Sequence, residues 1–285
     1  MSQQIVHASP CRHADAPSDW VIERIVNLLE RDIPLQTDFL NQFGLTPEEY
    51  RSGYRVAIER VRGRISASDR LKKSFVQNVL DAGVKNGQFS SVKVEEGVMT
   101  KVYRIQLASG KCVGVIRKGC PDGNHTTRWE RPDWAEELYL WWLCPESRVH
   151  EPGESVWKGV ARIKNKLQAE PQNRLDGVIF FDESCGTAVR PCPKQSYALV
   201  LEGVRFPPPC VYVLPDDLTA PSGRLNWNGQ RNVDFPRALL SVFGVPSSLA
   251  PDYSGFVGVE ILNASIRQVR ITSNYGNGRI TSVTT

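Results

Sequence analysis

Three short segments decide the fold: SVKVE at residues 91–95, VYRIQL at 102–107 and CVGVI at 112–116. Apolar and polar residues alternate in the first segment, and β-branched residues are frequent in all three, as is typical of strands. Ser109-Gly110 stands between the second and third segments and favours a tight turn. The stretch therefore predicts an antiparallel β-meander.

The residues before the meander have the spacing of helices. Apolar residues form a first stripe at Trp20, Ile25, Leu28 and Leu29. Thr46-Pro47-Glu48-Glu49 opens a second helix, because a Thr cap, a Pro at the first helical position and acids in the first turn suit the positive end of a helix. A third helix is expected over residues 68–84, before Lys85-Asn86-Gly87 ends it.

After the meander, helical spacing returns at residues 133–143 and 156–167, and the apolar side of the first helix carries Trp134, Trp141 and Trp142. This helix would turn Glu136 and Glu137 back toward the end of the third strand. Apolar runs predict buried strands at 177–181, 197–201 and 210–214, followed by a short helix at 235–243 and a hairpin turned at Asn277-Gly278. The order predicts an α/β or α+β protein with N-terminal helices and a β-rich C-terminal part.

The composition is that of a globular protein of 285 residues, 41% of them hydrophobic, with seven cysteines. Disordered, collagen-like and membrane classes are excluded, and no stretch approaches the roughly 18 apolar residues that a membrane span needs. The N-terminal residues show no basic-then-apolar leader pattern. An odd number of cysteines in a chain of this length favours a reducing compartment, so we expect a cytoplasmic protein without membrane association.

The formal net charge of +4 conceals a basic segment. Residues 51–73 contain eight basic and two acidic side chains, a net of +6, which leaves −2 for the rest of the chain. Projected on a helix, Arg51, Arg55 and Arg62 share one face. This face lies beside the apolar stripe formed by Tyr54, Ile58, Val61 and Ile65. Because each Lys or Arg that contacts a phosphate releases counterions, the backbone of double-stranded DNA is the expected partner. A solvated helical face is the alternative.

A second basic patch follows Glu260, because the remaining residues include Arg267, Arg270 and Arg279 and no acid. Both patches favour contacts with nucleic acid. The DNA-contacting residues that they predict are Arg51, Arg55, Arg62, Lys72, Lys73, Arg267 and Arg270.

The residues that carry chemistry follow the third strand. Lys118 ends this strand, and the turn that contains Asp122-Gly123-Asn124 delivers a carboxylate and an amide beside it, with His125 next. A Lys beside carboxylates suits metal-assisted cleavage of a phosphodiester, because acids hold Mg²⁺ while the ammonium orients water and offsets charge on the phosphate. In the alternative interpretation Lys118 merely ends a hairpin and Asp122-Gly123 is an ordinary turn.

At these residues the chain resembles bacterial type II restriction endonucleases of the PD-(D/E)xK superfamily, over residues 90–195. The motifs that carry the resemblance are Arg117-Lys118-Gly119, Asp122-Gly123-Asn124, Glu130-Arg131-Pro132, Asp176-Gly177, Cys185-Gly186-Thr187 and Arg190-Pro191-Cys192-Pro193-Lys194. The resemblance implies a mixed central sheet flanked by helices, Mg²⁺-dependent hydrolysis of double-stranded DNA at a specific sequence, and a homodimer that cuts both strands.

Carried over to this chain, the strand Lys of the family falls on Lys118. The family's acid two positions earlier falls on Ile116, which cannot bind a metal. Glu95 or Glu96 earlier in the meander would supply one ligand, and a displaced Asp122 or Glu130 would fill the gap. The catalytic residues implied are Lys118, Asp122 and Glu130, and the metal ligands are Glu96 and Asp122.

The sequence thus predicts four regions. Residues 1–18 form a flexible N-terminus and 19–88 a helical, basic, DNA-contacting region. Residues 89–205 form the catalytic core, and 206–285 a β-rich region that is a candidate specificity element. Ile116 leaves an alternative function open: a non-catalytic DNA-binding protein, or the silent subunit of a two-chain nuclease.

Cysteine chemistry offers a third hypothesis, a zinc-stabilised interaction protein. The side chains available as ligands are Cys120, His125, Cys144, His150, Cys185 and Cys192. No pair among them has the two-to-four residue spacing of common structural zinc sites. Buried free thiols are therefore the favoured interpretation.

Overall fold

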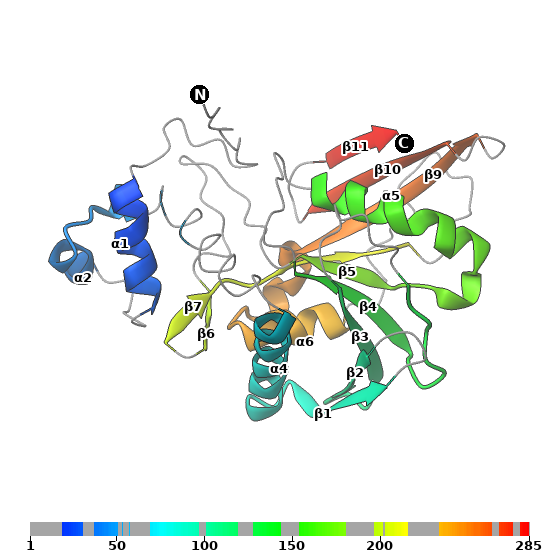
Figure 1. Cartoon of the computed structure of the whole chain (residues 1–285), viewed down its shortest axis with the longest axis horizontal. Helices are drawn as coiled ribbons and strands as arrows, with labels where there is room; N and C mark the ends of the chain where they lie inside the picture. Colours follow the sequence, from blue (N-terminus) through cyan, green and yellow to red (C-terminus); the bar gives the residue numbers. More distant parts are fainter. Residues whose placement is uncertain are drawn as a thin grey trace.

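A nine-stranded mixed sheet is the centre of the computed structural model, which describes residues 19–30, 37–50, 53, 57, 69–96, 101–118, 128–143, 154–180, 197–201, 203–215, 234–263, 268–275 and 280–284. Its strands, in their order across the sheet, are β1 (Phe89–Glu96), β2 (Lys101–Leu107), β3 (Cys112–Lys118), β4 (Glu137–Trp142), β5 (Gly177–Phe180), β8 (Cys210–Val213), β9 (Ser254–Asn263), β10 (Gln268–Tyr275) and β11 (Ile280–Thr284). Figure 1 shows the sheet with helices on both sides.

The pairing confirms the predicted meander and extends it into a mixed sheet. Strands β1, β2 and β3 are antiparallel neighbours, whereas β3, β4 and β5 are parallel. Strand β8 runs antiparallel to β5 and parallel to β9. The sheet therefore continues across residue 205, where the sequence placed a boundary between two regions. Strands β10 and β11 form the expected final hairpin, while Asn277-Gly278 lies outside the described residues.

Helices cover the two faces of the sheet according to the handedness of the crossovers. Helix α5 (Glu154–Ala169) connects the parallel strands β4 and β5 on one face. The β8-to-β9 crossover contains α6 (Asp234–Val242), and because β8 runs against β5, a right-handed crossover there lies on the opposite face. Helix α4 (Asp69–Lys85) shares that face and contacts α6 (Figure 1). All three helices were expected from their apolar spacing.

Residues 133–143 were expected to be helical, and this prediction is wrong, because residues 137–142 form β4. All six residues of the strand are buried. Adjacent side chains of a strand point to opposite faces, so Trp141 enters the core cluster beneath α4 and α6, while Trp142 enters the cluster beneath α5. A parallel strand buried on both faces is apolar almost throughout, and such a run can match helical spacing by coincidence.

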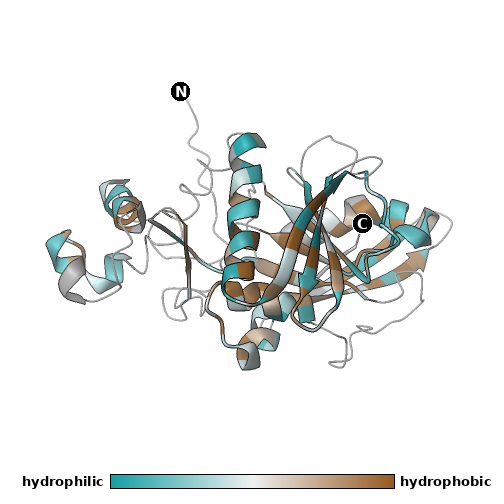
Figure 2. Ribbon diagram, turned by 90° about the horizontal axis from the view of Figure 1, so that it is seen from below, coloured by the Kyte–Doolittle hydropathy of each residue, from teal (hydrophilic) through white to brown (hydrophobic). Residues whose placement is uncertain are grey.

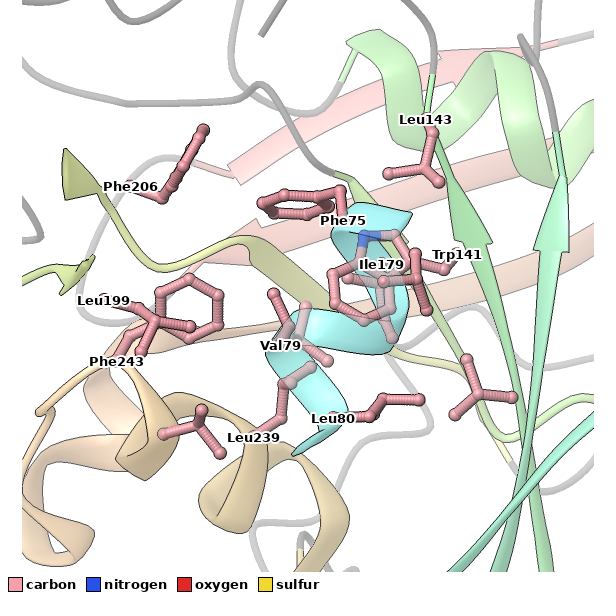
Figure 3. Packing of buried hydrophobic residues seen from close by; sticks show 14 of the residues in the cluster. Phe75, Val79, Leu80, Trp141, Leu143, Ile179, Leu199, Phe206, Leu239 and Phe243 are labelled. Carbon is pink, nitrogen blue, oxygen red and sulfur yellow. The ribbon is translucent and has the colours of Figure 1, made fainter. Parts of the chain in front are cut away.

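One end of the molecule holds a smaller unit made of α1 (Asp19–Glu30), α2 (Thr37–Gln42) and a separate two-stranded sheet, β6 (Leu199–Leu201) with β7 (Val204–Phe206). Figures 1 and 2 both place α1 and α2 at this end. The unit joins the main core through Phe75 of α4, whose ring lies 5.1 Å from that of Phe206 and 6.2 Å from that of Trp141 (Figure 3).

The apolar stripe of α1 differs from the predicted one. Trp20 is 51% exposed, and its ring contacts the Arg24 guanidinium instead of the core. The buried face of α1 consists of Val21, Ile22, Ile25, Val26 and Leu28. Helical spacing predicted the helix, but the face that packs into the core begins at Val21 and not at Trp20.

Candidate phosphate-binding site at the end of β3

Lys118 is the last residue of β3, and its side chain is half-buried on the sheet face that α5 covers. Its Nζ donates a hydrogen bond to the backbone carbonyl of Arg128. Burial lowers the pKa of the Lys118 ammonium, and the charge of Lys166 on α5 lowers this pKa further. Two cations therefore lie near one another at this end of the strand.

The residues that follow Arg128 are fixed under α5 by one large side chain. Trp129 is fully buried, and its indole Nε1 donates to the Asn173 carbonyl at 2.9 Å. The Arg131 backbone N–H donates to the Asn173 side-chain oxygen at 3.1 Å. These bonds hold residues 129–131 against η1 (Pro171–Asn173), and so they place the Arg128 carbonyl beside Lys118.

Lys166 is positioned by the same tryptophan. Its ammonium lies 5.1 Å from the centre of the Trp129 ring, and it pairs with Glu170 at 2.9 Å. Glu170 also accepts a hydrogen bond from the Asn173 amide at 2.7 Å. Sequence patterns did not indicate that Lys166, Trp129 or Asn173 lies near Lys118, because no motif joins these residues. Lys166 and Asn173 are 48 and 55 positions from Lys118.

The strand ends place Lys118 where α/β proteins commonly bind ligands. Lys118 is level with Trp142 of β4, and Trp142 is level with Phe180 of β5, so three parallel strands end at one edge. Ligands of α/β sheets bind outside the carboxyl ends of parallel strands. Among these three end residues, Lys118 supplies the charge.

Apolar side chains occupy the positions where acids would stand beside Lys118. Ile116 is two residues before it on the same face and is fully buried. Its partners on the neighbouring strands are Val102 and Leu140, which are also buried. The row across the sheet next to Lys118 is thus hydrophobic, and the absence of an acid at position 116 is not compensated on β2 or β4.

Glu96, the predicted metal ligand, is not brought to Lys118. It pairs with Lys101 at 2.7 Å, and the register places this pair on the face opposite Lys118. Glu95 lies on the face of Lys118 but two strands away, about 10 Å at the usual strand spacing, and it pairs with Arg104 at 3.1 Å. Both acids at the end of β1 therefore pair with cations of the neighbouring strand β2.

The remaining predicted acids differ in their positions. Glu130 is exposed and lies two residues after Arg128, on the segment that contacts Lys118. Asp122 lies outside the described residues. Glu136 and Glu137 do not face Lys118, which corrects the expectation: Glu137 begins β4 opposite Val113, five residues or about 17 Å along β3 from Lys118.

No group of three or more His, Cys, Asp or Glu side chains that could hold a metal ion occurs among the residues that the structure describes. Of the seven cysteines, Cys112 and Cys210 are described and both are free thiols. The side chains of the zinc hypothesis lie outside the described ranges.

The predicted DNA-contacting residues are only partly described. Lys73 is exposed on α4 and Lys72 is half-buried. Arg270 lies on β10, where it pairs with Glu260 at 3.0 Å, so the second basic patch is partly neutralised by the strand beside it. Arg51, Arg55, Arg62 and Arg267 lie outside the described residues.

Comparison with protein-family models, with curated proteins and with solved structures found no match to this chain. Among the described helices, none has the length and apolar character needed to cross a membrane.

Proposed function

We propose that this protein binds double-stranded DNA, with Lys118 and Lys166 facing one backbone phosphate at the carboxyl end of β3. One observation carries the proposal: the half-buried Lys118 ammonium has a carbonyl, and no carboxylate, as its partner among the described residues, and a second cation lies nearby. An ammonium has three N–H donors, so a phosphate oxygen can accept those that the Arg128 carbonyl leaves.

The lowered pKa of Lys118 supports an anionic ligand. Burial and Lys166 both disfavour the charged amine in the free protein. A phosphate would reverse both effects, because its charge stabilises the two ammonium groups together. The net charge of +6 over residues 51–73 favours a polyanion over a small phosphate.

The test measures binding of the full-length chain to a 24-base-pair duplex by fluorescence anisotropy over a range of salt concentrations. Lys118→Ala should weaken binding about 10-fold or more, because a hydrogen bond to a charged group contributes about 1.5–3 kcal/mol. It should also lower the slope of log K against log salt by about 1. Arg237→Ala, which removes an exposed cation of α6 on the opposite face of the sheet, is the matched control.

Two results would contradict the proposal. One is the absence of any salt-dependent binding to duplex DNA by the wild-type chain. The other is a Lys118→Ala variant whose affinity and salt slope equal those of Arg237→Ala.

A Mg²⁺-dependent, sequence-specific double-stranded DNA endonuclease of restriction type is the second candidate. The mixed sheet with helices on both faces favours it, because the resemblance implies a mixed central sheet flanked by helices. The buried Ile116, at the position of the family's acid, weighs against it. In this candidate Asp122 is a metal ligand, and Glu130 is the exposed acid that lies two residues after Arg128, on the segment that contacts Lys118.

Incubation of the chain with supercoiled plasmid and Mg²⁺ separates the two candidates. Discrete cutting that Lys118→Ala and Asp122→Ala both abolish, while DNA binding by Asp122→Ala persists, would establish the endonuclease, and a linear product would indicate a homodimer that cuts both strands. Binding without cutting would leave the non-catalytic DNA-binding protein or silent subunit.

A further inference from the structure

Strand β1 is an uncovered edge of the central sheet. It stands first in the strand order, and within the described part of the chain its one strand neighbour is β2 (Figure 1). Ser90, Ser91, Lys93 and Glu96 are exposed, and Val94 is 42% exposed. An edge strand has a row of backbone N–H and C=O groups that a strand of another chain can pair with.

The hairpin between β2 and β3 shows which backbone groups of β1 point outward. The Leu107 N–H donates to the Lys111 carbonyl at 2.9 Å, so the backbone groups of Leu107 point toward β3. These directions alternate along an antiparallel strand, so those of Arg104, three residues earlier, point toward β1, where its partner is Lys93. Alternate residues of β1 therefore direct their N–H and C=O away from the sheet, and these residues are Val92, Val94 and Glu96.

The charges of β1 are complementary to a second copy of the same strand. Lys93 and Glu95 are two residues apart and so share one face of the strand. If two β1 strands pair antiparallel around a twofold axis at Val94, Lys93 of each copy lies opposite Glu95 of the other.

Other registers are unfavourable. The outward backbone groups of both copies meet only in registers that differ by two residues. A shift in one direction places the two Lys93 residues opposite one another, and a shift in the other direction does the same for the two Glu95 residues. Like charges directly opposite one another are destabilising, so the charges select the register centred on Val94.

In the single chain the charge of Lys93 is not balanced across the strands. Lys93 lies directly opposite Arg104 of β2, which is a pair of like charges. Arg104 is bound to Glu95 at 3.1 Å, and its guanidinium lies 5.0 Å from the centre of the Trp134 ring. No acid among the residues that the structure describes pairs with Lys93. Glu95 of a second copy would place a carboxylate beside it.

We propose that two copies of this chain form a dimer through antiparallel pairing of their β1 strands, with Lys93 of each copy opposite Glu95 of the other. Val92, Val94 and Glu96 of the two copies exchange about six backbone hydrogen bonds. The facing Lys93 and Glu95 form a non-hydrogen-bonded pair, in which the Cα atoms are about 4.5 Å apart and the side chains are close. The exposed Val94 side chains cover one another at the axis. This inference is independent of the DNA binding proposed above.

Sedimentation velocity of the full-length chain measures the dissociation constant of the dimer. A small interface of this kind gives a weak dimer, so we expect a constant in the micromolar range. Lys93→Glu and Glu95→Lys should each weaken association of the variant with itself about 10-fold or more, because both ion pairs become pairs of like charge. Asp252→Lys, which reverses an exposed charge of η3 (Ser247–Tyr253), is the matched control and should dimerise as the wild type does.

An equimolar mixture of the two variants should restore the dimer. Lys93→Glu has two acids at this edge and Glu95→Lys has two cations, so both cross-strand pairs of the mixed dimer join opposite charges. Loss of folding in either variant would not produce this recovery. Thermal unfolding midpoints of the separate variants confirm that each is folded.

Val94→Pro tests the backbone pairing. The Val94 N–H points away from β2, so a proline there removes a hydrogen bond of the dimer and none of the β1–β2 pairing, as is tolerated in edge strands. The folded variant should dimerise about 10-fold more weakly or less.

Val94→Cys tests the register. Facing Cα atoms of a hydrogen-bonded pair are about 5.5 Å apart, which a disulfide can span, so mild oxidation should link the two copies. Val200→Cys, at an exposed position of β6, is the control and should link no more than the oxidised wild type does.

Three results would overturn the inference. These are a wild-type chain that stays monomeric throughout the micromolar range, a mixture of Lys93→Glu and Glu95→Lys that associates no better than the separate variants, and a folded Val94→Pro variant that dimerises as the wild type does. Binding of DNA by Lys118 is measured on other variants and can hold whether or not the dimer forms.

Discussion

Charged residues have different kinds of partner at the two edges of the central sheet where the parallel strands begin and end. At the edge where β4 and β5 begin, every described acid in the interior has a cation: Asp176 pairs with Arg131 at 2.8 Å, and Glu137 pairs with Lys111 at 2.8 Å. At the edge where β3, β4 and β5 end, Lys118 has a carbonyl as its partner. A buried charge that is paired already has its partner within the fold, whereas a cation that contacts no carboxylate among the described residues is available to a ligand.

At the edge where β4 and β5 begin, hydrogen bonds and ion pairs also connect the strands to neighbouring loops and to α6. Asp176 accepts the Leu138 N–H at 2.8 Å at the start of β4. Lys111 contacts Asp234 of α6 at 3.2 Å, and the Tyr139 hydroxyl donates to Glu137 at 3.0 Å. These groups stabilise the junction of strands, loops and α6, so we assign them a structural role.

Asp176→Ala should produce the largest effect. It leaves Arg131 without its carboxylate and the Leu138 N–H without its acceptor, and breaking a buried pair in this way costs about 3–5 kcal/mol. Urea unfolding at neutral pH measures the loss of stability. A loss below about 1 kcal/mol would contradict the distinction between the two edges.

The pH dependence of DNA binding should identify Lys118 as the ligand-facing charge. Because its folded pKa is lowered from 10.5, Lys118 loses its proton at a pH where exposed lysines stay charged. Affinity should therefore fall about 10-fold as the pH rises toward 10. Lys118→Arg stays charged and should bind without this fall, and an identical pH profile for both proteins would exclude Lys118 from the interface.

Glu137 predicts a smaller effect on stability against pH. Burial raises the pKa of its carboxyl above 4.5 despite the Lys111 and Tyr139 contacts. The folded protein then binds more protons than the unfolded chain just above pH 4.5, so the contribution of this group to stability falls as pH rises through that window. The stability of the wild type minus that of Glu137→Gln, from urea unfolding between pH 4 and 8, should decrease with pH. A difference that increases would contradict the assignment.

Lys118→Met should have the smallest effect on stability. The substitution keeps the length of the side chain and removes a half-buried charge that has no carboxylate partner among the described residues. The free energy of unfolding, measured in urea, should therefore fall by less than about 1 kcal/mol or rise. A loss comparable with that of Asp176→Ala would mean that Lys118 is structural.

Local sequence patterns predicted the elements whose cause is local. The meander at residues 91–116 alternates as strands do, and α4, α5 and α6 follow from helical spacing. The Thr46 cap followed from the residues themselves and forms in the structure with both of its hydrogen bonds. These features depend on interactions within a few residues, so the pattern is sufficient.

The prediction for residues 133–143 was wrong because burial on both faces gives a strand the composition of a buried helix. The sequence could not predict on which face of the sheet Glu96 lies, because only the register of β1, β2 and β3 shows that it faces away from Lys118. A shift of one residue in either pairing would reverse that conclusion.

The sequence by itself determined that this chain builds a β-meander ending in Lys118, preceded by helices and a basic segment, because periodicity, caps and charge are properties of neighbouring residues. Only the tertiary structure decided which groups Lys118 meets. Lys166 and the Arg128 carbonyl come from separate segments that Trp129 holds together, and the acids of β1 are paired elsewhere. Contacts between distant segments depend on sheet register and crossover handedness, which a local pattern does not encode.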